Sequence, residues 1–176
     1  WRWLFIFFYI KSIDKDVELQ NIGINQICNF IKHGIDKYTN LPYHAYNLEN
    51  DMQLGISGWG RGVGWFLTSI AISLKYMDNS LKEYKTIRET FKSVAISAME
   101  YQHQDGLFKW SLLAHKGPVD TSASAMILYA MALGINLGII DPCYRGAVKK
   151  GYNAFEPYIK DGKLLGVFVG DRKSVV

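Results

Sequence analysis

The chain repeats one pattern three times, a short turn followed by leucine and then apolar or aromatic residues. The copies read NLPYHAY, DGLFKWSL and DGKLLGV, and their leucines are Leu41, Leu107 and Leu164. Successive copies lie about one helical hairpin apart, and such a repeat indicates stacked hairpins that bury their apolar faces against one another. An open solenoid and a closed toroid both satisfy this pattern. Glycine-rich, aromatic connections favour the toroid, because they place rigid loops around a pocket at one rim.

Apolar residues between these turns recur at the spacing of an α-helix. No stretch alternates in the way that a large sheet would require, so we predict an all-α chain. The predicted helices cover residues 16–33, 63–77, 80–102 and 121–133, with a further helix starting at 142.

Residues at the predicted helix ends suggest how each helix begins or stops. Gly34 is expected to end the first helix in a left-handed conformation. Ser80 and Glu83 match a capping box for the third. Asp120 and Asp141 are expected to cap the two helices that follow them.

Length and composition set the scale of the fold. The 176 residues are 49% hydrophobic and 20% charged, which is typical of a globular domain. Because the chain starts at Trp1 and its last stretch, GVFVGDRKSVV, has no closing element, we expect residues 1–176 to form a single, partial domain. The opening WRWLFIFFYI has about half the roughly 20 apolar residues that span a bilayer, so it predicts a buried helix and no membrane partner.

Charge and cysteine content limit the kinds of ligand and partner that the chain is expected to bind. A net charge of +4, with lysines interspersed among acids, is no footprint of a nucleic-acid partner. Cys28 and Cys143 fit neither a disulfide framework nor a metal site, and the four histidines are scattered. We therefore expect no metal and no cofactor, and reduced cysteines in a cytoplasmic protein.

The segment GWGRGVGW enters the second predicted helix and is the strongest candidate for a binding site. Arg61 offers a planar fork of donors suited to a carboxylate, and Trp59 and Trp65 offer flat faces for a sugar ring. The intervening glycines would let a ligand approach the backbone at a helix N-terminus, which favours an anion. An acidic saccharide would fit. A tight turn with core tryptophans, and an arginine that caps a neighbouring helix, fits the same spacing.

Four acids outside this segment are candidates for chemistry. Asp14, Asp16 and Asp36 are interpreted as exposed turn or cap residues, and Asp105 as a turn residue before glycine.

Three motifs carry a resemblance to a known family. GWGRGVGW resembles the signature WGRGNGW of the unsaturated rhamnogalacturonyl hydrolases, glycoside hydrolase family 105, which are relatives of the family 88 unsaturated glucuronyl hydrolases. NLPYHAYN is similar to the family's GLFYHGYD, and DTSASAMILYAM to its DTSGTAMIAYAL. The resemblance covers most of residues 16–160. It departs at Val63, where asparagine is usual, and near both termini.

The resemblance implies half of an (α/α)6 barrel, a toroid of six helical hairpins. It also implies a hydrolase that hydrates the C4=C5 double bond of an unsaturated galacturonyl or glucuronyl residue left by polysaccharide lyases. Trp59 and Trp65 would stack on the sugars, Arg61 would lie near the substrate carboxylate, and His44 would hydrogen-bond in the same cleft.

The family's catalytic aspartate begins a helix whose closest match here is WRWLFIFFY, which would place it upstream of Trp1 and leaves the catalytic residue of this chain unknown. The alternatives are a truncated remnant or binding module without turnover, and a helical-repeat scaffold. A half-toroid would also expose helix faces, so self-association is expected.

Overall fold

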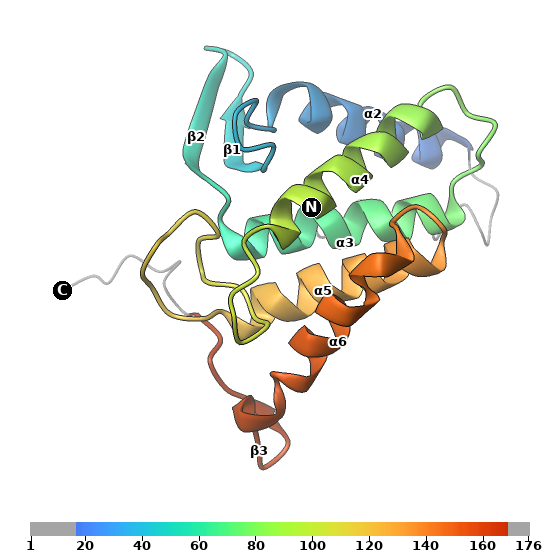
Figure 1. Ribbon diagram of the computed structural model, residues 1–176. Helices are drawn as coiled ribbons and strands as arrows, with labels where there is room; N and C mark the ends of the chain where they lie inside the picture. The colour runs from blue at the N-terminus through green and yellow to red at the C-terminus, as the bar shows by residue number, and fades with distance from the viewer. Residues whose placement is uncertain (1–16, 169–176) are drawn as a thin grey trace.

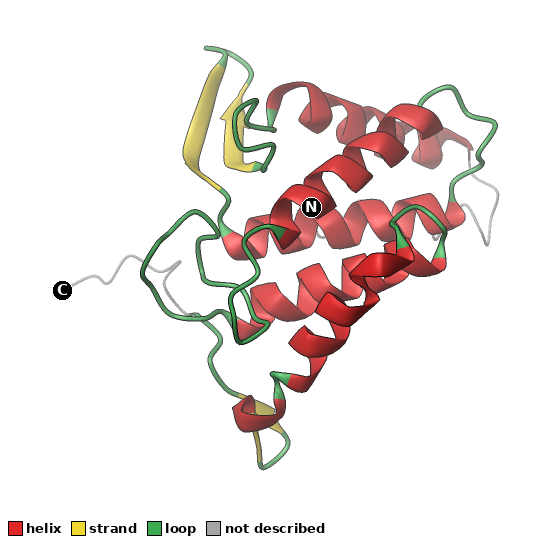
Figure 2. Ribbon diagram, viewed as in Figure 1, coloured by secondary structure: helices red, strands yellow, loops and turns green. Residues whose placement is uncertain are grey.

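The computed structural model describes residues 17–168, and helices make up most of them (Figure 2). The predicted helix at WRWLFIFFYI lies outside the described residues. The elements, in chain order, are α2 (Val17–His33), β1 (Tyr43–Asn47), β2 (Met52–Ser57), α3 (Gly60–Tyr76), α4 (Tyr84–Met99), α5 (Thr121–Asn136), the 3-10 turn Pro142–Tyr144, α6 (Arg145–Asn153), the 3-10 turn Glu156–Tyr158, β3 (Ile159–Lys160) and β4 (Lys163–Leu164).

The helices alternate in direction, as expected for consecutive hairpins. Helices α3 and α5 lie side by side and begin at the same end, while α2, α4 and α6 return in the opposite direction (Figure 1). Helix α4 packs on both α3 and α5, and α6 packs on α5. The arrangement confirms the helical fold class. The short pairs β1–β2 and β3–β4 are both antiparallel hairpins in the connections.

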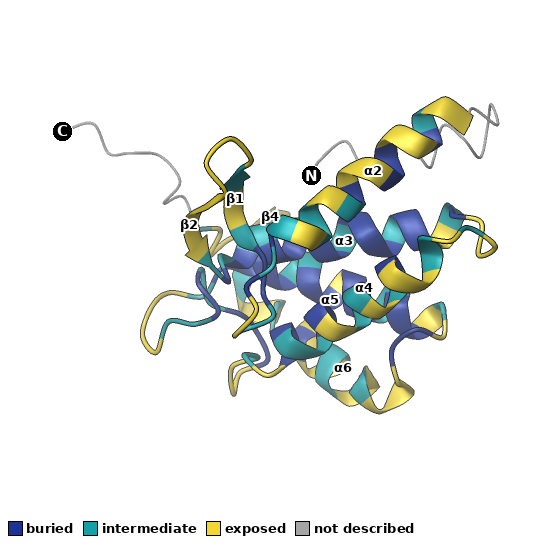
Figure 3. Ribbon diagram, turned by 90° about the horizontal axis from the view of Figure 1, so that it is seen from above, coloured by how far each residue is buried: buried dark blue, intermediate teal, exposed yellow. Residues whose placement is uncertain are grey.

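Burial divides the helices into an inner pair and an outer set (Figure 3). Helix α5 is apolar or small on nearly every side, which suits an inner helix, and α3 buries four turns of apolar side chains. Helices α2 and α4 are amphipathic and show solvent their polar faces. The largest fully buried side chains include Phe66, Phe91 and Phe108, each stabilising the fold by about 1.5–3 kcal/mol through burial.

Glycines of α3 allow a close approach to α5. A Cβ on Gly60 would lie 2.7 Å from the Lys109 carbonyl oxygen and 3.0 Å from the Ala123 Cβ, and a Cβ on Gly64 would lie 2.8 Å from the Met126 Cβ. Both glycines are buried. At these two positions the prediction of glycines open to a ligand is therefore wrong, because α5 and the connection before it occupy the space.

The three repeated turns gather at the end where α3 and α5 begin (Figure 1). Backbone hydrogen bonds link the first loop to the second, from the Leu112 amide to the Gly58 carbonyl and from the Gly60 amide to the Trp110 carbonyl. Leu41 and Leu107 of the repeats are fully buried, whereas Leu164 is 40% exposed. The loops thus form one rim, as the repeat predicted, and the third copy is the most open.

Two of the four predicted helix ends are confirmed in full. The Asp120 carboxylate accepts hydrogen bonds from the Ser122 and Ala123 amides, and the Asp141 carboxylate accepts one from the Cys143 amide.

The capping box predicted at Ser80 is wrong, whereas α2 does end at His33, just before Gly34, and only the left-handed conformation predicted for that glycine is wrong. Helix α4 begins at Tyr84, its N-cap Glu83 makes no side-chain capping bond, and the Ser80 amide donates to Asp78 in a turn. Gly34 has no positive φ. Its missing side chain instead makes room for the Phe30 ring, whose nearest atoms would lie 2.5 Å from a Cβ.

Between residues 17 and 168, no helix combines the length and apolarity needed to cross a bilayer. Several large apolar side chains are exposed within the same range, including Met52, Leu54 and Ile56 on one face of β2 and Tyr129 on α5. Self-association through such surfaces stays a prediction.

Candidate functional site

The turn between α2 and β1 fixes the position of the first hairpin. Asp36 accepts hydrogen bonds from the Thr39 hydroxyl at 2.6 Å, the Thr39 amide at 3.1 Å and the Tyr43 hydroxyl at 3.1 Å. The Thr39 hydroxyl also lies 3.1 Å from that of Ser57, where β2 ends. Asp36 is only 8% exposed, so its prediction as an exposed turn residue is half wrong: it holds the turn, but from a buried position.

Acid sensitivity follows from this turn. Burial raises the pKa of Asp36, but hydrogen bonds from Thr39, Tyr38 and Tyr43 outweigh it and hold the pKa below its ordinary 3.8. The Asp36 contribution to stability is therefore present above pH 3.8 and is lost as pH falls through the lower, folded-state pKa. We expect Asp36→Asn to lower the free energy of unfolding by about 1–3 kcal/mol near neutral pH and much less in acid.

Urea unfolding across this acid range measures the difference. Asp161→Asn, at an exposed turn, is the control. An equal loss for Asp36→Asn at all pH values would contradict the assigned role of the carboxylate.

Trp59 occupies the extended position that precedes α3, with φ −61° and ψ 117°. Its ring meets the His44 ring edge-on, with centroids 4.6 Å apart and an angle of 64°. The Arg61 guanidinium carbon lies 5.2 Å from the Trp59 ring centroid, within the range of a cation–π contact. Gly62 lies against this ring, since a Cβ there would come within 2.8 Å of Cε3. The structure therefore brings His44, Trp59 and Arg61 together.

Trp65 stands four residues after Arg61 on α3, and this spacing places both on one face of the helix. The Trp65 side chain is half-buried. It thus lies one helical turn further along α3 than Arg61.

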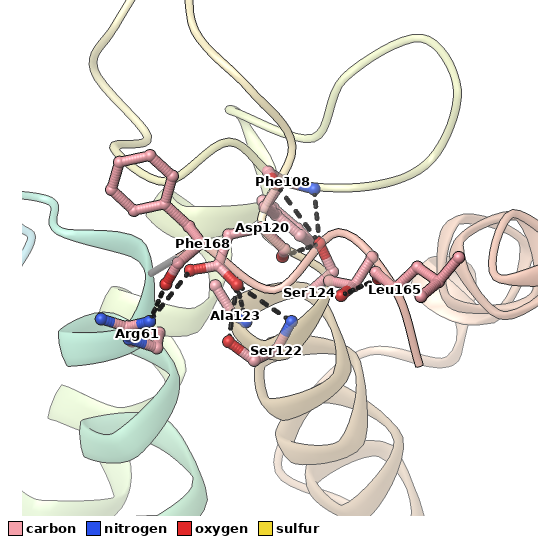
Figure 4. Close-up of polar contacts among 9 residues, drawn as sticks. Arg61, Phe108, Asp120, Ser122, Ala123, Ser124, Leu165 and Phe168 are labelled. Carbon is pink, nitrogen blue, oxygen red and sulfur yellow. Dashed lines mark hydrogen bonds and ion pairs between the residues drawn. The ribbon is translucent and has the colours of Figure 1, made fainter. Parts of the chain in front are cut away.

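Arg61 reaches from α3 toward the N-terminus of α5 (Figure 4). Its Nη1 donates a hydrogen bond to the Phe168 carbonyl and lies 4.0 Å from Oδ2 of Asp120. The Arg61 side chain is 17% exposed. An arginine that meets the cap of a neighbouring helix matches part of the alternative interpretation of the motif, and its exposed fraction still leaves it at the rim.

The chain returns over this arginine through residues 165–168. The Thr121 amide donates to the Gly166 carbonyl at 3.0 Å, and the Thr121 hydroxyl donates to the Leu165 carbonyl at 2.7 Å. The Phe168 ring then stacks on Trp110, with centroids 5.3 Å apart and an angle of 20°. Sequence reasoning missed this aromatic pair, although Trp110 lies inside the repeated motif DGLFKWSL.

A cavity of about 350 Å3 opens on the other side of His44, between α2 and the β1–β2 hairpin. Its polar lining comes from both elements, and the rings of His33 and Tyr46 lie 4.9 Å apart along it. The lining includes Gln26, Asn29, His33, His44, Tyr46 and Leu48.

In the described part of the chain, no three histidine, cysteine, aspartate or glutamate side chains gather where they could hold a metal ion. The groups that the rim offers a ligand are thus aromatic faces, an imidazole and a guanidinium. This set suits a sugar ring that carries a carboxylate.

Paired helices with aromatic loops at one rim define the class as the six-hairpin, (α/α)6-barrel proteins. Solved structures share this fold over about half their length. A possible member of glycoside hydrolase family 105 from Klebsiella pneumoniae has a TM-score of 0.86 and 18% identity, over 93% of this chain and 44% of that one. The unsaturated glucuronyl hydrolase from Bacillus sp. GL1, described as responsible for the degradation of glycosaminoglycan, has a TM-score of 0.71 and 19% identity, over 91% and 46%.

The chain belongs to glycosyl hydrolase family 88, whose model matches residues 4–174. It is 36% identical over 99 residues to an unsaturated 3S-rhamnoglycuronyl hydrolase from Formosa agariphila, a match that covers 54% of this chain and 26% of the relative. The chain thus spans about a quarter of the length of this curated relative and about half of the length of each of these solved structures. The resemblance in the motifs is confirmed at the level of the family.

Proposed function

We propose that this chain is the saccharide-binding part of a hydrolase that releases unsaturated galacturonic or glucuronic acid from lyase-generated oligosaccharides. The observation that carries the proposal is the grouping of Trp59, His44 and Arg61 at the rim. The Trp59 ring centroid lies 4.6 Å from that of His44 and 5.2 Å from the Arg61 guanidinium carbon. Trp59 and Trp65 supply faces for sugar rings, and His44 supplies a hydrogen bond. Family membership supports the substrate class.

Arg61 is proposed to bind the uronate carboxylate. Its bond to the Phe168 carbonyl is to a neutral acceptor, and a charged carboxylate is the stronger partner for a guanidinium. The unsaturated uronate would therefore compete with Phe168 for Nη1.

The proposed reaction is hydration of the double bond. A carboxylic acid protonates C4, water adds its oxygen to C5 and loses a proton to solvent or base, and the resulting hemiketal collapses with release of the uronic acid. Asp120 does not fit the proton donor, because its side chain is fully buried and caps α5. The donor is expected on the sequence that precedes Trp1 in the family pattern.

Loss of the ultraviolet absorbance of an unsaturated rhamnogalacturonan disaccharide tests turnover, and calorimetric titration of the same disaccharide tests binding. We expect Arg61→Ala to weaken binding about tenfold, as loss of one charge-assisted hydrogen bond would. Arg88→Ala is the matched control, because Arg88 pairs with Glu89 on the outer helix α4.

Binding without turnover would favour the alternative, a saccharide-binding module that lacks a catalytic aspartate. Failure of the unaltered chain to bind the disaccharide, with its fold intact, would overturn the proposal.

A further inference from the structure

Asp120 holds more negative charge than a helix cap requires. Its Oδ1 accepts three hydrogen bonds, from the Ser122 amide at 3.0 Å, the Ser122 hydroxyl at 2.6 Å and the Ala123 amide at 3.2 Å. Its Oδ2 is buried without a hydrogen-bond partner among the described residues, and the side chain is 0% exposed. Serine or asparagine would cap α5 equally well without burying this second oxygen.

Among the described residues, Arg61 is the one cation that pairs with Asp120, and its Nη1 lies 4.0 Å from the unbonded Oδ2 (Figure 4). A buried carboxylate oxygen without a hydrogen bond is costly, and an opposite charge nearby offsets part of that cost. The three bonds to Oδ1 fix the carboxylate, so Oδ2 is a stationary charge at the start of α5.

We infer that Asp120 is a positioning residue that holds the Arg61 guanidinium in the orientation needed to bind a uronate. The inference rests on the proposed function, because a uronate is the ligand whose binding would depend on that orientation. It joins two motifs far apart in the sequence, GWGRGVGW and DTSASA, as one functional unit.

Two effects of removing the Asp120 charge oppose each other. Loss of the carboxylate makes the net charge of the site around Arg61 more positive, which would attract anions. The N-terminus of α5 carries partial positive charge, however, and Arg61 would then face it without the intervening carboxylate. Because a planar guanidinium binds a carboxylate well only in a defined orientation, we expect displacement of Arg61 to dominate and uronate binding to weaken.

Asp120→Asn is the decisive variant, since asparagine keeps an oxygen for the cap and replaces the charged Oδ2 with a neutral amide NH2. Ser122→Ala is its control, because it removes one hydrogen bond of the cap and leaves the charge in place. Binding is measured with the unsaturated rhamnogalacturonan disaccharide and with the same disaccharide reduced at its carboxyl group.

We expect Asp120→Asn to weaken binding of the acidic disaccharide about tenfold and to leave binding of the reduced disaccharide unchanged. In the Arg61→Ala background, Asp120→Asn should cause no further loss. Equal losses in both backgrounds, or binding unchanged by Asp120→Asn, would overturn the inference.

A second readout does not depend on the saccharide. The Nε–H signal of Arg61 in NMR spectra, assigned with Arg61→Lys, should move in Asp120→Asn and stay in place in Ser122→Ala. An unmoved signal in Asp120→Asn would overturn the inference even if no saccharide bound. A moved signal with an unaltered chain that binds no saccharide would refute the proposed function alone.

Discussion

Gly60→Ala is expected to lower the free energy of unfolding by about 1–3 kcal/mol, the usual cost of forcing extra atoms into a packed interior. The added methyl group would meet the Lys109 carbonyl oxygen at 2.7 Å and the Ala123 Cβ at 3.0 Å. A backbone carbonyl cannot turn away as the end of a flexible side chain can. Helix α3 would therefore have to move away from the α4–α5 connection and from the start of α5, and thermal or urea unfolding measures the loss.

Gly146→Ala is the matched control. Gly146 also lies in a helix, α6, but a Cβ there would meet nothing within 4 Å. Alanine has the better helix propensity, so this variant should be neutral or more stable by up to about 1 kcal/mol. If both variants were equally stable, the close packing of α3 on α5 would not explain the glycine at position 60.

Trp59→Ala should have the largest effect on ligand binding, a loss of about thirtyfold or more, as expected for an aromatic residue that anchors a ligand. The substitution removes the proposed sugar-stacking face, the edge contact with His44 and the surface over which Arg61 lies. Titration with the unsaturated disaccharide measures the loss.

Trp59→Phe separates stacking from the rest of the side chain. Phenylalanine keeps a flat ring and should recover most of the lost affinity. Trp110→Phe serves as an aromatic control outside the predicted set, since Trp110 already stacks on Phe168. Full affinity in Trp59→Ala would remove Trp59 from the proposed site.

Helical periodicity predicted α2, α3 and α4 because each buries one continuous face. The α3 stripe that includes Phe66 and Ile70 is fully buried, as its spacing indicated. The β1–β2 hairpin was not predicted, because the alternation in β2 covers only the six residues Met52–Ser57 and none of its apolar side chains is buried. The false capping box at Ser80 shows the limit of a short motif, since the preceding Asp78 already bonds its amide.

The site residues were predicted from their types and from the family resemblance, and the structure places His44, Trp59 and Arg61 together. The Asp120–Arg61 pair and the Trp110–Phe168 stack each join two residues that are far apart in the sequence. Contacts of this kind depend on how hairpins pack, which no local spacing specifies. The same limit explains Asp36, whose burial follows from the position of β2 beside its turn.

The main-chain bonds across the rim have a consequence for how binding preference can change during evolution. Three of these bonds join amides to carbonyls: Leu112 to Gly58, Gly60 to Trp110 and Thr121 to Gly166. Every residue type except proline has both a backbone N–H donor and a carbonyl acceptor. Rim side chains can therefore be exchanged while the loops keep their places, except at Gly58, Gly60 and Gly166, where a positive φ or a close contact requires glycine. Substitutions at the rim could therefore change the proposed saccharide preference while the helices beneath it stay unaltered.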